Sequence, residues 1–150
     1  MKAAAMHDTN QYVIFRLSDK MYGLNIQFVN TIEKLMPITR VPKTPGFIKG
    51  VINLRGEIIP VMCIRERFGL DAVQETDETR IIIVKVGEFQ VGMIVDIVEE
   101  VLHLTEDSTE SVSGLSTSVS MNYVLGVGKV DGKVVSLLNM EELVDISDKD

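Results

Sequence analysis

The chain contains two copies of one hydrophobic pattern, and this internal repeat constrains its fold more than any other feature. In a first block, the apolar positions of residues 13–32 match those of residues 82–101 at a constant offset of 69. In a second block, residues 50–68 match residues 126–144 at an offset of 76. Because the two blocks keep their order, we expect a pseudo-twofold architecture, with a first copy at about residues 12–70 and a second at about residues 81–146.

Each copy has the pattern of short β-strands joined by tight turns. Residues 13–17 alternate as a strand does, a turn follows at residues 18–20, and a second strand begins near residue 22. Residues 81–95 repeat this hairpin, and residues 50–62 and 124–138 supply a further hairpin in each copy. At least eight short strands in two copies predict a mainly β fold of two small barrels packed side by side, rather than one large sheet.

Helices are expected to be few and short. Ile26, Val29 and Ile32 recur at helical spacing before a proline at position 37, and residues 140–144 have the pattern of a last amphipathic turn. The Ser/Thr/Gly-rich stretch at residues 108–119 is expected to form a mobile loop.

The start of the last helix has a recognisable cap. Asn139, with Glu142 three positions later, resembles a capping box. The offset of the second block places Cys63 at the same position, before a short helix that ends at Gly69. Because cysteine is a poor N-cap, Cys63→Asp is expected to raise the stability by about 0.5–2 kcal/mol.

Composition favours a cytoplasmic domain. With 150 residues and 45% apolar content the chain can bury one continuous core, and its single cysteine excludes an intramolecular disulfide. No run of apolar residues approaches a membrane-spanning length, and a net charge of -7 opposes binding to nucleic acid.

The two halves of the sequence differ in the sign of their net charge, since residues 1–70 carry ten Lys/Arg and five Asp/Glu, whereas residues 71–150 carry five and seventeen. Such halves could steer protein partners to either end of the molecule, or could simply be solvated faces.

Patterns for catalysis, cofactors and metals are weak. Cys63 is the only thiol, and neither His7 nor His103 stands beside it in a nucleophile and base pattern. His103 alternates with leucines and is expected on a strand surface, and no spacing of ligands predicts a metal or a cofactor. An enzyme with a carboxylate pair and a small-ligand-binding pair of barrels remain alternatives to a non-enzymatic adaptor.

The hairpin at residues 50–61 is the best candidate for a working surface. Its turn, Arg55-Gly56, lies between two apolar strands, so the guanidinium should point into solvent while the glycine accepts a positive φ. An arginine in this place suits recognition of carboxylates or carbonyls on a protein helix, although a simple solvated turn charge is the alternative. The second copy has Asp131 at the position of Arg55, so the two barrels differ in this turn.

Four segments in fixed order resemble the CheW-like domains of chemotaxis coupling proteins, over about residues 11–146. These segments are YGLNIQFVNTIEKL (22–35), TPGFIKGVINLRGEIIPV (44–61), EFQVGMIVDIVEEVLHLT (88–105) and YVLGVGKVDGKVVSLLNMEEL (123–143). The resemblance implies a single domain of two SH3-like five-stranded barrels, flanked by flexible tails at residues 1–10 and 147–150. The chain leaves no room for the kinase or receiver domains that accompany some CheW-like domains, so a free-standing adaptor is expected.

The resemblance also implies a function and partners. CheW-like adaptors link the cytoplasmic helical tips of chemoreceptors to the regulatory domain of the histidine kinase CheA, so this chain is expected to be cytoplasmic and recruited to membrane receptor arrays through its partners. By position, the implied receptor-binding residues are Val29, Thr31, Gly50, Arg55 and Gly56, the first two in the expected helical segment. Thr31 stands where some relatives have Glu, and Cys63 where Asp or Asn is usual. Kinase contacts are expected at exposed apolar strand edges.

Overall fold

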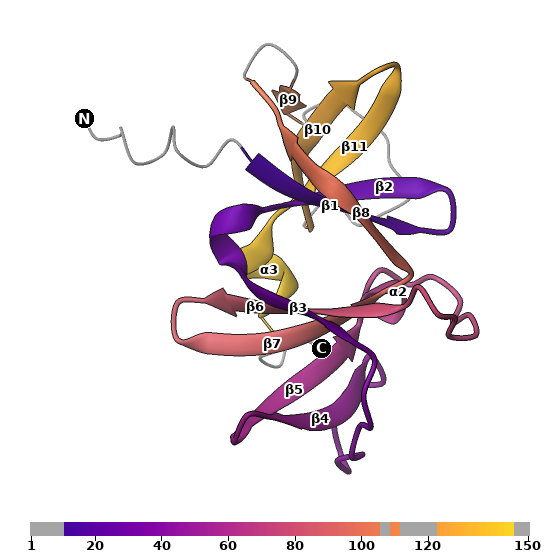
Figure 1. Cartoon of the computed structure of the whole chain (residues 1–150), viewed down its shortest axis with the longest axis vertical. Coiled ribbons are helices and arrows are strands. Elements are labelled where there is room, and N and C mark those ends of the chain that lie inside the picture. The colour runs from indigo at the N-terminus through magenta and orange to yellow at the C-terminus, as the bar shows by residue number, and fades with distance from the viewer. Residues whose placement is uncertain (1–10, 106–108, 112–122, 146–150) are drawn as a thin grey trace. The chain divides into compact units, whose positions relative to one another are not determined.

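The computed structural model describes residues 11–105, 109–111 and 123–145, and it is mainly β, as the sequence predicts (Figure 1). The tails expected at residues 1–10 and 147–150 lie outside the described residues. So does most of the loop expected at residues 108–119, but its residues Thr109–Ser111 form a short strand.

The chain divides into two compact units. The central unit is Val29–Val98, and the terminal unit joins Met1–Phe28 to Glu99–Asp150. The central unit holds a five-stranded sheet in the order β3-β6-β7-β5-β4, and the terminal unit holds a six-stranded sheet in the order β8-β1-β2-β11-β10-β9. Two barrel-like sheets were expected, and the sixth strand is the short β9.

The elements of the central unit are β3 (Val29–Lys34), β4 (Ile48–Leu54), β5 (Glu57–Cys63), α2 (Ile64–Arg67), β6 (Arg80–Val86) and β7 (Phe89–Val95). Those of the six-stranded sheet and its surroundings are β1 (Gln11–Leu17), β2 (Lys20–Asn25), the 3-10 helix η1 (Ile26–Phe28), β8 (Ile97–His103), β9 (Thr109–Ser111), β10 (Val124–Val130), β11 (Lys133–Leu138) and α3 (Met140–Leu143).

Each sheet contains strands from both copies of the repeat. In the central unit, β3, β4 and β5 of the first copy pair with the β6–β7 hairpin of the second. In the terminal unit, the β1–β2 hairpin of the first copy joins β8, β10 and β11 of the second. The copies are joined by the parallel pairs β5–β7 and β11–β2, which occupy equivalent places in the two copies, and also by β3 beside β6 and β8 beside β1. The expected barrels are therefore built by exchange and not from one copy each.

The backbone repeats along with the sequence. Ser18 and Gly87, which the first offset makes equivalent, have φ angles of 59° and 61°. Arg55 and Asp131, which the second offset makes equivalent, both have a φ of 52°. The β4–β5 and β10–β11 hairpins also share a register shift, between Ile48 and Gly50 in one and between Val124 and Gly126 in the other. The two offsets found in the sequence thus describe real structural equivalence.

Each unit buries an aliphatic cluster of its own. The clusters are Ile52, Ile59, Val61, Ile81 and Ile83 in the central unit, and Ile14, Leu104, Val135 and Leu137 in the terminal unit. Ile83 corresponds to Ile14 by the first offset, and Val61 corresponds to Leu137 by the second. Each core therefore packs the first hairpin of one copy against the last strand of the other, which couples the two copies energetically.

The helical segment expected around Val29 is wrong. Only Ile26–Phe28 is helical, as a single 3-10 turn, and β3 follows directly with alternating burial. Val29, Thr31 and Ile32 are β-branched, and pairing with β6 gives them the pleated surface that such side chains favour. Tertiary pairing therefore overrides the helical spacing.

The two expected helix N-caps are found at equivalent places. The Asn139 side chain accepts a hydrogen bond from the Glu142 N–H at 3.2 Å, at the start of α3. Cys63 is the N-cap of α2 and makes no capping hydrogen bond through its side chain. The prediction that Cys63 occupies the N-cap position is confirmed. Within the described ranges, the structure contains no helix with the length and apolarity needed to cross a membrane.

Candidate functional site

The tip of the β4–β5 hairpin presents Arg55 to solvent, as predicted. Leu54 and Glu57 form the last strand pair, and Arg55 and Gly56 between them have φ angles of 52° and 88°. Two successive positive φ values are typical of the type I′ turn that matches the twist of a hairpin. The Asn53 side chain accepts a hydrogen bond from the Gly56 N–H at 3.1 Å, and the Arg55 side chain is 69% exposed.

The Arg55 guanidinium has a carboxylate neighbour that the sequence did not indicate. Its Nη1 lies 3.4 Å from Oε2 of Glu33, whose side chain is 18% exposed. Glu33 belongs to β3 and Arg55 follows β4, and these are the two edge strands of the sheet. The ion pair therefore joins opposite edges of the central unit. Thr31 does not supply this charge, but Glu33, two positions along the same strand, does.

The segment that follows β3 also meets β4 through the backbone. Thr39, in the segment after β3, exchanges two hydrogen bonds with Val51 of β4, at N···O distances of 2.9 and 2.8 Å. Gly50 makes this approach possible, since it has a φ of 143° and any Cβ there would overlap the Thr39 carbonyl. Gly50 is buried, so its place in the predicted site reflects this packing of the backbone.

Val29 and Thr31 do not share one face of a helix, as the sequence suggested. They pair with Val84 and Ile83 of β6, with a register shift between them. Because adjacent residues of β6 face opposite sides, the shift directs Val29 and Thr31 to opposite faces of the sheet. The Thr31 Oγ1 is buried and has no hydrogen-bond partner among the described residues. All five predicted residues lie in the central unit, but only Arg55 and Gly56 are exposed together.

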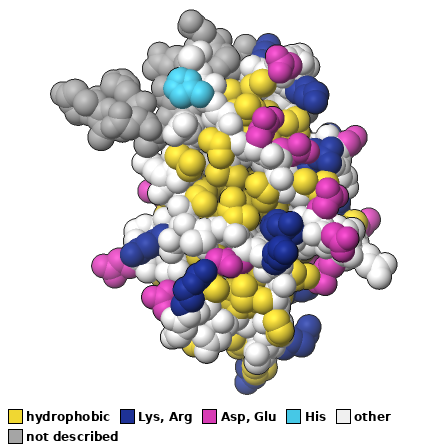
Figure 2. Space-filling model, in the orientation of Figure 1, with side chains coloured by type: hydrophobic (Ala, Val, Ile, Leu, Met, Phe, Trp, Pro, Cys, Tyr) yellow, Lys and Arg dark blue, Asp and Glu magenta, His cyan; other side chains and the backbone are white. Residues whose placement is uncertain are grey.

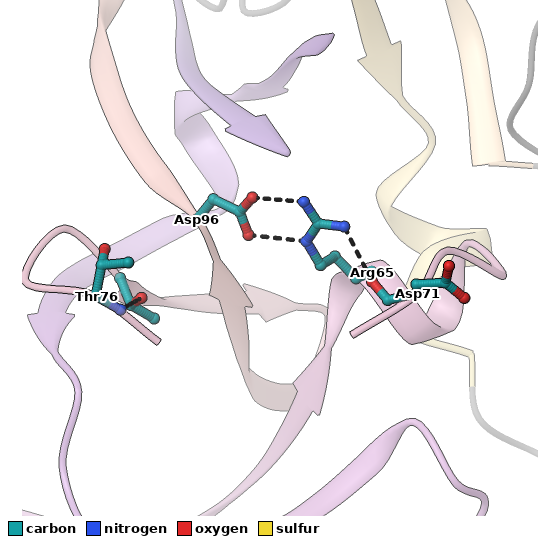
Figure 3. A network of polar contacts seen from close by, with 5 residues as sticks. Arg65, Asp71, Thr76 and Asp96 are labelled. Atoms are coloured by element: carbon teal, nitrogen blue, oxygen red, sulfur yellow. Dashed lines mark hydrogen bonds and ion pairs between the residues drawn. The ribbon is translucent and has the colours of Figure 1, made fainter. Parts of the chain in front are cut away.

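A buried polar network near α2 was not indicated by any pattern in the sequence. Arg65 of α2 donates through Nε and Nη2 to the two carboxylate oxygens of Asp96, at 3.1 and 2.8 Å, and through Nη1 to the Asp71 carbonyl at 2.9 Å (Figure 3). The Arg65 residue is only 7% exposed. The equivalent positions in the repeat hold Glu141 and Gln27, so this bidentate pair belongs to the central unit alone. The pair with Asp96 connects α2 to the end of β7, and the bond to Asp71 connects α2 to the loop that follows it.

Exposed aliphatic side chains recur at equivalent strand positions. Ile58 of β5 and Val134 of β11 are exposed directly after their turns, and Ile32 of β3 and Val101 of β8 are exposed as well. Ile58 follows Arg55 closely along the same hairpin. Apolar side chains beside an arginine are a composition typical of protein-binding surfaces.

Among the described residues, the groups considered for other chemistry are not assembled into a site, and His7 lies outside these residues. Burial raises the pKa of the half-buried Cys63 thiol, and the negative charge of Glu66 adds to this effect, so the thiol is protonated at neutral pH and is a poor nucleophile. His103 is exposed at the end of β8, as expected. In the part of the chain that the structure describes, no three His, Cys, Asp or Glu side chains come together to hold a metal ion.

One hollow among the described residues can be compared with a small-ligand site. This hollow of about 330 Å³ is lined by residues 40–46, which include Arg40, Lys43 and two prolines, and by Ile48 and Lys49 at the start of β4. An apolar pocket with a few convergent polar groups would be expected for a small organic ligand. This hollow has the opposite character.

The charges are not divided as the halves of the sequence suggested. The central unit carries nine Lys/Arg and nine Asp/Glu, whereas the terminal unit carries six and thirteen. Exchange of strands mixes the basic and acidic halves, so the central unit is neutral. Figure 2 shows basic and acidic side chains interspersed on the face that is drawn, with hydrophobic side chains between them.

A mainly β chain with two barrel-like sheets, a charged hairpin tip and exposed aliphatic strand positions has the features of a protein-binding β-barrel module. The CheW-like domain family model matches residues 11–148. Similar proteins are the chemotaxis protein CheW of Bacillus subtilis, 35% identical over 89% of this chain and 85% of that protein, and the chemotaxis protein CheW of Klebsiella aerogenes, 33% identical over 89% and 81%.

A solved structure is also similar. The crystal structure of the scaffolding protein TtCheW from Thermoanaerobacter tengcongensis has a TM-score of 0.86 and 37% sequence identity, and the match covers 94% of this chain and 96% of that one. The chain belongs to the CheW-like domain family.

Proposed function

We propose that this chain is a cytoplasmic chemotaxis adaptor that couples the helical tips of chemoreceptors to the histidine kinase CheA, without catalysis of its own. Its relatives are named as chemotaxis proteins, and its structural neighbour as a scaffolding protein. The observation that carries the proposal is the exposed Arg55 at the hairpin tip, beside the exposed Ile58.

The proposed receptor-binding surface consists of Val29, Thr31, Gly50, Arg55 and Gly56. Arg55 is the direct contact, because its planar guanidinium can donate to carboxylate or carbonyl oxygens on a helix surface in a fixed geometry. Gly56 allows the tight turn that lifts Arg55 out of the sheet. Gly50 and Thr31 act from within the unit, by shaping the strands that carry the tip.

The proposed kinase contact uses the aliphatic strand positions. Ile58 and Val134 are exposed at equivalent places of the two hairpins, so the chain offers two similar apolar surfaces in different charge environments. Arg55 precedes one of them and Asp131 the other. Such a difference in charge would allow a receptor and a kinase domain to be distinguished.

Replacement of Arg55 tests the receptor-binding surface. Arg55→Ala is expected to weaken binding of a receptor cytoplasmic fragment about thirtyfold, the loss typical of a well-placed interface arginine of about 2 kcal/mol. Binding is measured by titration calorimetry, and the melting temperature should be nearly unchanged because the Arg55 side chain is 69% exposed. Asp131→Ala, at the equivalent turn, is the matched control and should bind normally. Unchanged affinity of Arg55→Ala would remove this residue from the surface.

Coupling itself is tested with both partners present. The intact chain should retain a receptor fragment and a CheA regulatory domain separately, and should form a ternary complex when all three are mixed. Size-exclusion chromatography with light scattering gives the masses of the complexes. Mutually exclusive binding of the two partners would contradict an adaptor role.

A further inference from the structure

The contact between Arg55 and Glu33 leaves most of the guanidinium available. Among the described residues, the Nη1 contact with Glu33 is the only ion pair or side-chain hydrogen bond that Arg55 makes. A guanidinium has five N–H donors, so those on Nη2 and Nε are not used in the contact with Glu33. Glu33 thus holds one corner of the group and leaves the rest of it free to bind an acceptor.

Glu33 itself is well anchored. It lies directly opposite Ile81 of β6, and Ile81 belongs to the buried cluster of the central unit. The Glu33 side chain is 18% exposed against 69% for Arg55, so the carboxylate is the more enclosed of the two groups.

We propose that Glu33 is the positioning residue for Arg55: it restrains the guanidinium at the hairpin tip, so that less side-chain freedom is lost when Arg55 binds oxygen acceptors on a partner helix. This inference rests on the proposed receptor-binding function. A long arginine side chain loses rotamer entropy when it is fixed in an interface, and a restraint already present in the free protein reduces that cost.

A purely structural role for the ion pair is the competing explanation. The segment that follows β3 is already joined to β4 by the paired backbone groups of Thr39 and Val51, at 2.9 and 2.8 Å. An ion pair with a side chain as exposed as Arg55 adds little to the stability of a fold. The pair is therefore better placed to act on the orientation of Arg55 than on closure of the sheet.

A double-mutant cycle tests the proposal through binding. Glu33→Gln should weaken binding of the receptor cytoplasmic fragment by about three- to fivefold, the range that an exposed ion pair can supply. Arg55→Ala should cost about thirtyfold, and the double variant should lose no more than Arg55→Ala alone. Glu57→Gln is the matched control, because Glu57 flanks the same turn but accepts a hydrogen bond from Gln90. If the losses of Glu33→Gln and Arg55→Ala multiply, Glu33 contacts the partner itself and the positioning role is refuted.

A second measurement uses the free protein. The heteronuclear NOE of the Arg55 Nε–Hε group should fall in Glu33→Gln and stay unchanged in Glu57→Gln, while the melting temperatures of all variants agree. A lowered melting temperature of Glu33→Gln with an unchanged NOE would establish the structural role and overturn the proposal. If the wild-type chain fails to bind the receptor fragment, the proposed function is overturned, whereas normal wild-type binding with unchanged Glu33→Gln affinity overturns only the positioning role.

Discussion

Arg55 adopts a backbone conformation that its side chain does not favour. Its φ of 52° lies in the left-handed region, where residues other than glycine are uncommon. Asp131 has the same φ in the equivalent turn, but a short polar side chain tolerates this region better. The Arg55-Gly56 turn therefore accepts some strain to place a guanidinium where the second copy places a carboxylate. Strain of this kind is often retained at functional positions.

Gly50 provides a residue-scale test of the packing at the edge of the sheet. Gly50→Ala is expected to lower the free energy of unfolding by about 2–4 kcal/mol, because a Cβ would overlap the Thr39 carbonyl and a φ of 143° is strained for alanine. Urea denaturation measures the change. Gly46→Ala is the control, since nothing lies within 4 Å of a Cβ there, and its effect should stay within about 0.5 kcal/mol. Equal effects of the two substitutions would contradict the close approach of Thr39.

At the residue scale, the sequence predicts the conformation and exposure of residues that belong to a repeat or turn pattern. It misses residues whose role depends on a contact with a residue far along the chain. The repeat and the turn chemistry indicated that Gly56 would accept a positive φ and that Arg55 would be exposed. Glu33 was missed because a helix was expected in its place, and in a helix Glu33 and Thr31 point in different directions. In a strand the period of two brings them to the same face, and Glu33 reaches Arg55 from there.

At the scale of elements, β3 shows where periodicity is ambiguous. Three aliphatic residues at a spacing of three fit a helix, and the same segment, half-buried and exposed in turn, fits an edge strand. Length decides such cases only partly, because a segment of this length is short for a helix and normal for a strand. The pairing with β6 comes from the other copy of the repeat, far along the chain, and no local pattern contains it.

The short helices α2 and α3 differ at the N-cap, where Cys63 makes no side-chain hydrogen bond and Asn139 makes one. This difference allows a test of the cap's contribution to stability. Cys63→Asn copies Asn139 onto α2 and is expected to raise the stability by about 1 kcal/mol, since the side chain can accept from the free N–H groups of the first turn. Asparagine is chosen because it adds no negative charge near Glu66, whose carboxylate already acts on the Cys63 position by raising the thiol pKa. The converse change, Asn139→Cys, should lower the stability by a similar amount through loss of the bond to the Glu142 N–H. Thermal melts of both variants that match the wild type would show that neither cap matters.

At the scale of the whole molecule, the sequence predicts the number of copies but not how their strands associate. Alternating apolar residues define which face of a strand is buried and carry no information on the neighbouring strand. The parallel pairs β5–β7 and β11–β2 are contacts between the two copies. Each of these strands therefore has a pairing partner that its own copy does not contain. Two hairpins per copy were predicted correctly, and their exchange could be learned only from the structure.

This exchange predicts that the two copies fold only together. A protease site placed in the exposed loop at residues 73–75 would allow the folded chain to be cut between the copies, and the cut protein should remain assembled because both cores draw on both fragments. Once separated in denaturant, each fragment alone should lack cooperative unfolding in circular dichroism, since it lacks one member of each parallel join. Mixing the fragments should restore the native spectrum and the cooperative transition. A fragment that folds cooperatively alone would mean that one copy can close a barrel by itself, and would contradict this prediction.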